Sequence, residues 1–188
     1  MILRSMLFVP GHNKKLIDSA SRCDADAIIL DVEDSVLPIS NKEIARNTIV
    51  ETIKSRKLDK FKIFIRINDR ESKQFLQDMR TLAIPGVTGF IYPKSLNSGD
   101  IYFFDKFLHI IELENNIPDN MFKIIPLIET TSAIVNLDAI CKASSRVVGL
   151  AFGCEDYVTD LHGLHTHGGD SLYTARSLIA ITDRKSVV

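Results

Sequence analysis

The feature that most constrains the fold is an alternation of two kinds of segment along the chain. Short, β-branched apolar runs of about five residues recur, and longer segments with helical spacing of apolar residues separate them. We interpret the runs as strands at Met6–Val9, Ala27–Leu30, Ile63–Ile67, Gly89–Tyr92, Ile124–Ile128 and Val147–Phe152. Continuous apolar strands that alternate with helices indicate a parallel sheet covered on both faces.

The segments with helical spacing complete six strand–helix units. They are Lys15–Cys23, Lys42–Ser55, Ser72–Leu82, Tyr102–Leu113, Ser132–Cys141 and Asp170–Ile181. The second is preceded by Ser40 and carries Glu43, the spacing of a capping box in which each side chain accepts a backbone hydrogen bond. No linker or low-complexity segment separates the units, so we predict one domain.

Six such units fit either an open, doubly wound sheet or three quarters of an eight-stranded barrel. The first strand is followed by Pro10-Gly11-His12-Asn13 rather than by a GxGxxG turn. Polar residues end nearly every strand, whereas a doubly wound sheet concentrates its site at one switch point. We therefore predict an α/β fold of the TIM (βα)8 barrel type, incomplete here with about six βα units.

Composition and charge exclude several classes of function. The 188 residues carry 23 basic and 24 acidic side chains, a net charge of −1, which gives no general attraction to nucleic acid or to an anionic membrane. No apolar run approaches the roughly 18 residues of a membrane span, and the N-terminus does not resemble a signal peptide. The three cysteines lie far apart without zinc-like spacing, so we expect a reduced, cytoplasmic protein.

Two acidic residues give the best indication of function. Glu129 and Asp156 each follow an apolar strand, and the carboxyl ends of parallel strands lie at one edge of the sheet, where α/β enzymes bind ligands. Two carboxylates that converge there suit Mg²⁺, which prefers oxygen ligands. In the alternative reading, Glu155 and Asp156 form a solvated loop pair. Glu is a poor N-cap, and Thr130 or Thr131 can cap the next helix instead.

Other strand ends add polar side chains to the same edge. Arg66 can bind a substrate carboxylate bidentately, and a metal ion beside it would stabilise a developing enolate oxygen during cleavage of a C–C bond. Arg66 could instead pair with Asp31 or Asp34, and Lys94 could simply face solvent. The run His162-Gly-Leu-His165-Thr-His167 could ligate zinc, but its glycines favour a loop. We read Cys154 as a packing residue.

Several of these segments resemble one family in order along nearly the whole chain. The matching segments are Arg4–Gly11, Ala25–Val36, Ile65–Asn68, Tyr92–Lys94, Pro126–Thr130, Phe152–Asp156 and Leu172–Arg176. They resemble the citrate lyase beta subunit family within the HpcH/HpaI aldolase superfamily, which includes malyl-CoA and citramalyl-CoA lyases. The resemblance implies a TIM barrel, dependence on Mg²⁺, and cleavage or formation of a C–C bond in a 3-hydroxyacyl-CoA thioester.

The resemblance also assigns roles to individual residues. Glu129 and Asp156 resemble the metal ligands, with Glu129 also near substrate, and Arg66 resembles the residue that binds the substrate carboxylate. Phe8 and Lys14, with Lys15, lie where relatives contact CoA, although Asn13 stands beside them where some relatives carry Arg. An acidic motif near the metal corresponds to Glu33 and Asp34, which would orient ligands or waters.

The end of the chain departs from the family pattern. Relatives continue through two more strands and a segment that completes the site, so the general acid or base is not assigned. After Ile181 the amphipathic pattern stops, and 183–188 resemble translated adapter DNA. We therefore interpret 1–182 as a truncated barrel domain and 183–188 as a non-native tail.

Three functions remain open on the sequence alone. The first is a lyase acting on malyl-CoA, citramalyl-CoA or a citryl thioester, expected as a homo-oligomer when full length. The second is a pyruvate-dependent class II aldolase that acts on free 2-keto acids. The third is an inactive fragment, or a subunit that is active only inside a complex.

Overall fold

The structure, a computed structural model, describes residues 3–186, with side chains up to residue 183. Its centre is a six-stranded sheet in which the strands follow chain order and all neighbours pair in parallel. The strands are β1 (Met6–Pro10), β2 (Ala27–Asp31), β3 (Lys62–Arg66), β4 (Gly89–Tyr92), β5 (Lys123–Ile128) and β6 (Ala151–Phe152). This order fits a (βα)8-type barrel and excludes a doubly wound sheet, in which the strand order reverses.

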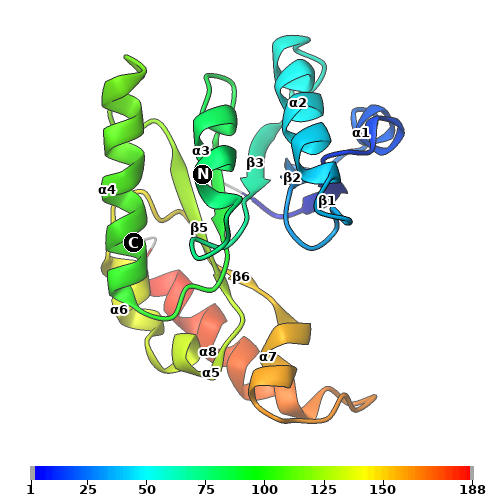
Figure 1. Ribbon diagram of the computed structural model, residues 1–188. Coiled ribbons are helices and arrows are strands. Elements are labelled where there is room, and N and C mark those ends of the chain that lie inside the picture. The colour runs from blue at the N-terminus through cyan, green and yellow to red at the C-terminus, as the bar shows by residue number, and fades with distance from the viewer. Residues whose placement is uncertain (1–2, 187–188) are drawn as a thin grey trace.

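Helices follow each strand. They are α1 (Lys14–Ala20), α2 (Asn41–Lys54), α3 (Phe75–Leu82), α4 (Ser98–Glu114), α5 (Thr131–Val135), α6 (Leu137–Lys142), α7 (Cys154–Asp160) and α8 (Asp170–Ser186). Figure 1 shows α1 to α4 one after another along the sheet in chain order, while α5 to α8 gather near its β6 end. None of these helices is both long and apolar enough to cross a membrane, within the residues described.

The strands β2 to β5 are buried on both faces, as the continuous apolar runs predict, whereas β1 leaves Leu7 and Phe8 exposed. The larger core lies between the sheet and the outer helices and includes Ile28 and Leu30 of β2. The alternate residues Ala27 and Ile29 point to the other face, where they join a smaller cluster with Phe64, Ile91, Ile125 and Leu127. Because side chains alternate along a strand, this inner cluster fixes which residues face inward at the strand ends.

The last strand is shorter than the expected Val147–Phe152. Ile124 bridges to Val147, but pairing resumes only at Leu127 opposite Ala151, so the register shifts by one residue. The segment leading into β6 thus contains one extra residue, which interrupts the ladder in the manner of a β-bulge. Gly149 lies in the interrupted stretch, where a residue without a side chain weakens a strand.

The expected helix 132–141 is divided in two by an asparagine. Asn136 ends α5 and begins α6, and its side-chain amide donates to the carbonyls of Ser132 and Leu96. These hydrogen bonds give the backbone an alternative to a continuous helix.

Two predictions about helix ends are wrong. Ser40 precedes α2 in helical conformation without a side-chain cap, so the predicted capping box with Glu43 is absent; such a box forms instead between Asn97 and Asp100 at α4. The last helix does not end at Ile181, since α8 continues to Ser186. No Gly or Pro interrupts that stretch, so the backbone can continue as a helix.

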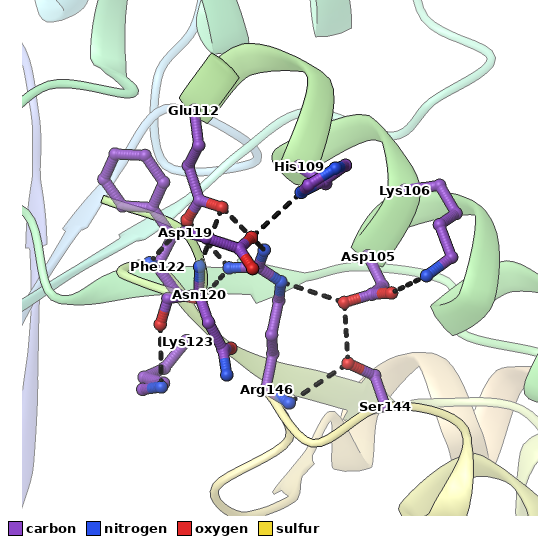
Figure 2. Close-up of polar contacts among 10 residues, drawn as sticks. All are labelled: Asp105, Lys106, His109, Glu112, Asp119, Asn120, Phe122, Lys123, Ser144 and Arg146. Atoms are coloured by element: carbon purple, nitrogen blue, oxygen red, sulfur yellow. Dashed lines mark hydrogen bonds and ion pairs between the residues drawn. The ribbon is translucent and has the colours of Figure 1, made fainter. Parts of the chain in front are cut away.

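A buried arginine joins elements at the amino-terminal end of the strands (Figure 2). Arg146, 2% exposed, donates from both terminal nitrogens to Glu112 of α4 at 2.7 and 2.6 Å. It also donates to Asp105 and to the carbonyl of Phe122, just before β5. His109, Glu112 and Asp119 have ligand atoms within 4.8 Å of one another, but Arg146 already supplies positive charge to this group.

Replacing Arg146 with Met should therefore unfold the protein more easily. The change leaves the buried Glu112 carboxylate without a cation, and breaking such a pair costs about 3–5 kcal/mol. Urea denaturation measures the loss. The control is Lys142→Ala, which removes an exposed ion pair with Asp138 and should cost about 1 kcal/mol or less. Equal losses in the two variants would contradict the expected role of Arg146.

Candidate metal centre

The carboxyl ends of the strands bring one set of side chains together. In β3, Phe64 belongs to the inner cluster, so Arg66, two residues later, continues on the same face. The same alternation takes Ile29 to Asp31 in β2, and it takes Leu127 of β5 to Glu129. The active sites of (βα)8 barrels lie at this end, above the filled interior.

Glu129 is buried, 4% exposed, immediately after β5. One of its oxygens, Oε1, accepts a 2.6 Å hydrogen bond from the backbone N–H of Lys94. The prediction that a threonine caps the next helix is correct. The Thr130 hydroxyl accepts a hydrogen bond from the Ala133 N–H at the start of α5. Glu129 therefore does not act as an N-cap, and its carboxylate remains at the sheet edge.

Asp156 lies in the first turn of α7, an unpredicted helix, rather than in a loop. Glu155 and Asp156 are both exposed. The Glu155 carboxylate lies 3.2 Å from Nε2 of His165. Asp156 and Glu129 line the same two cavities. The two acids predicted to converge thus do so, one buried and one exposed.

Two cavities meet at this pair of acids. A cavity of about 450 Å³ is lined by Glu129 and Asp156 together with Arg66, Phe8 and Asp34. A second cavity, of about 590 Å³, shares Glu129 and Asp156 but is lined on its other sides by residues such as Lys94 and Thr159. Each volume is sufficient for a small organic molecule.

Arg66 is held by a carboxylate of the neighbouring strand. Its Nε and Nη2 donate to the two oxygens of Asp31, each at 2.7 Å, in a bidentate pair. Its Nη1 lies 3.3 Å from both Glu33 and Asp34. The structural pairing left open by the sequence is present, so the Nε–Nη2 edge is not available for a substrate carboxylate.

Two carboxyl groups at this edge have pKa values raised by burial. Burial raises the pKa of Glu33 to about 8, with Arg66 opposing and the charges of Asp34 and Glu129 adding to the shift. Burial also raises the pKa of Glu129 to about 7, against the Lys94 hydrogen bond and with the charge of Asp156 adding to the shift. Mg²⁺ prefers carboxylate oxygens, and a bound cation would favour the ionised form of these groups, so the residues present fit Mg²⁺.

The residues predicted to contact CoA separate in the structure. Phe8 lines the smaller cavity, and its ring lies 5.3 Å from the Arg66 guanidinium carbon. Lys14 is exposed at the first turn of α1 and lines neither cavity next to Glu129. Asn13 caps α1 by accepting from the Leu16 N–H.

The remaining candidates take structural or peripheral positions. Lys94 is 60% exposed at its side chain, which lies 3.1 Å from Asp69. His162, His165 and His167 lie in the connection between α7 and α8, and they form no three-ligand group among the described residues. Two backbone contacts of Glu129, with the Lys94 N–H and with Gly153, were not predicted from the sequence. Contacts made by backbone groups leave no side-chain pattern.

The chain matches a known protein family and its fold. The family model for HpcH/HpaI aldolase/citrate lyase matches residues 4–188, so the chain belongs to this family. The citrate lyase subunit beta of Haemophilus influenzae is 30% identical over 176 residues, 94% of this chain and 60% of that protein. The mitochondrial citramalyl-CoA lyase of Homo sapiens is 28% identical over 190 residues, 95% of this chain and 55% of that protein.

A solved structure agrees with the fold. The citrate lyase beta subunit from M. tuberculosis, complexed with oxaloacetate and magnesium, has a TM-score of 0.70 and 25% sequence identity. The match covers 96% of this chain and 74% of that chain. By contrast, the chain spans 60% or less of the length of the two curated relatives above.

The Asp31–Arg66 pair generates a pH-dependent prediction. Burial raises the pKa of Asp31, but the hydrogen bonds and charge of Arg66 outweigh burial and hold the pKa below its ordinary value. The stabilisation is therefore present above the unfolded pKa of about 3.9 and is lost as pH falls through the lower folded value. Asp31→Asn should destabilise the protein by about 3 kcal/mol at pH 7.

Denaturation at a series of pH values tests this. The difference between the parent protein and Asp31→Asn should narrow as the pH falls below about 4. An Asp138→Asn control, at an exposed pair, should differ little from the parent throughout. A difference for Asp31→Asn that stays constant down to pH 2 would show that ionisation of Asp31 is not its source.

Proposed function

We propose that this chain carries the Mg²⁺ and substrate-carboxylate site of a carbon–carbon lyase that acts on a 3-hydroxyacyl-CoA thioester. The observation that carries the proposal is the convergence of Glu129 and Asp156 on a cavity that Arg66 also lines. Membership of the HpcH/HpaI family supports it, as do the names of the relatives, a citrate lyase subunit and a citramalyl-CoA lyase.

Glu129 and Asp156 would hold the ion, which supplies positive charge next to the oxygen on which charge develops as the bond breaks. The chain's own residues set the substrate's orientation. Arg66 has its Nη1 turned toward Asp34, whose side chain is 69% exposed, so a substrate carboxylate can take the place of Asp34 at this nitrogen. Asp31 keeps the guanidinium fixed while this exchange occurs.

Apolar groups line the other side of the same cavity. Phe8, Leu127 and Phe152 exclude water from part of its wall, which strengthens the electrostatic interactions of Arg66 and Glu129 with a bound anion. The carboxyl group of Glu33 lies 3.3 Å from Nη1 of Arg66 and would orient water or ligands.

A second candidate is an aldolase that acts on free 2-keto acids. It is supported by the M. tuberculosis structure, whose ligand is oxaloacetate, and by the exposed position of Lys14 outside the cavity. Assays of acetyl-CoA release from malyl-CoA and citramalyl-CoA, set beside pyruvate release from hydroxy-keto acids, separate the two. The relatives named as citrate lyase subunits also support the reading that activity requires partner subunits, which a reconstitution assay would test.

Metal binding provides the direct test of the site. Glu129→Gln and Asp156→Asn should each weaken Mg²⁺ affinity at least about tenfold and lower turnover, because each removes a charged oxygen ligand. Calorimetric titration with Mg²⁺ measures the affinity. Glu114→Gln, at the exposed end of α4, is the matched control and should bind as the parent does. Unchanged affinity in both site variants would refute the assignment.

Arg66→Lys tests recognition of the substrate carboxylate. Lysine is a point charge that cannot hold Asp31 bidentately and present a further donor. The fall in kcat/KM should therefore correspond to a loss of transition-state stabilisation on the order of a few kcal/mol. Steady-state kinetics measure the change, and Arg80→Lys on α3 serves as control. A kcat/KM equal to that of the parent would leave Arg66 with a structural role alone.

A further inference from the structure

The Glu129 carboxylate is flanked by backbone from both neighbouring strands. On the β4 side, the N–H of Lys94 donates to Oε1 at 2.6 Å. Lys94 has a φ of 49°, in the left-handed region that non-glycine residues seldom adopt. Such a conformation persists only where surrounding structure requires it, and here it aims an N–H at a buried carboxylate.

On the β6 side, Gly153 lies against the same side chain. A Cβ at this position would stand 2.8 Å from Glu129 Cβ and 2.9 Å from Glu129 Oε2. No real side chain tolerates such distances, so any residue other than glycine would displace the Glu129 side chain. The φ of Gly153 is −88°, which every residue adopts; the requirement for glycine at this position is therefore one of space alone.

We propose that Lys94 and Gly153 are positioning residues, which hold Glu129 so that its Oε2 is presented to the metal ion. Lys94 acts through its backbone N–H on Oε1, and Gly153 acts by leaving room for Oε2. The proposal rests on the assignment of Glu129 as a metal ligand and deepens it. It also explains how Oε1 of Glu129 is fixed while the side chain stays buried at the carboxyl ends of the strands.

Substitutions at two glycines test the steric part. Gly153→Ala and Gly153→Ser should each weaken Mn²⁺ binding to the full chain by about 10- to 100-fold, the usual cost of disturbing a group that orients a ligand. The matched control is Gly149→Ala, because a Cβ there has nothing nearer than 3.9 Å. Titration followed by electron paramagnetic resonance of Mn²⁺ gives the affinity, and thermal melts report folding.

Serine separates the steric effect from an effect on α7. Gly153 is the N-cap of α7, where serine is a preferred residue and alanine is not. If Gly153→Ser binds Mn²⁺ as tightly as Gly149→Ala, the steric role is wrong, whatever Gly153→Ala does. Weak binding in both Gly153 variants, with melts like that of the control, supports it.

Two substitutions of Lys94 test the backbone part. Lys94→Gly and Lys94→Val both remove the charge and its ion pair with Asp69, but glycine favours the left-handed conformation and β-branched valine resists it. We expect Lys94→Val to bind Mn²⁺ at least about tenfold more weakly than Lys94→Gly. Equal affinities would show that the direction of the N–H does not matter and would overturn this part.

The parent protein and Glu129→Gln complete the series. Binding by the parent that is lost in Glu129→Gln establishes the metal site independently of the positioning residues. Failure of the glycine and lysine comparisons would then contradict only the positioning roles. If the parent itself binds no Mn²⁺, both the proposed function and this inference fail.

Discussion

Parallel pairing of consecutive strands in chain order is the constraint on which the rest of the structure depends. It brings the carboxyl ends of β1 to β6 to one edge, and the twofold alternation of side chains then selects which residues face inward there. Arg66 and Glu129 come together because each follows an inward apolar residue of its own strand. The opposite end is fastened separately, by Arg146 and the acids of α4.

Electrostatics at the acidic edge are arranged asymmetrically. The single bidentate pair between Asp31 and Arg66 satisfies one carboxylate fully. Burial raises the pKa values of Glu33 and Glu129, and carboxyl groups perturbed in this way cluster at functional sites. A cation bound at the proposed site would stabilise the folded protein.

Much of this was accessible from the sequence. Apolar runs predicted all six strands, and acids placed after strands predicted the meeting of Glu129 with Asp156. The pairing of Arg66 with Asp31 was foreseen as an alternative, but the choice depended on distances across the sheet. The short helix containing Asp156, the division of a helix at Asn136 and the contacts of Lys94 and Gly153 depend on backbone geometry, which residue types alone do not encode.

The extra residue before β6 has a consequence for how the chain tolerates length changes. Successive side chains of a strand point to opposite faces of the sheet. Inserting or deleting one residue within a regular ladder therefore exchanges the inward and outward side chains beyond it. Four steps separate Val147 from Ala151, but only three separate their partners Ile124 and Leu127. Removing one residue around Gly149 would make the two spacings equal, so both pairs, and the side on which Gly153 meets Glu129, would be kept. The extra residue therefore lies in a stretch whose length can change by one without altering the pairing on either side.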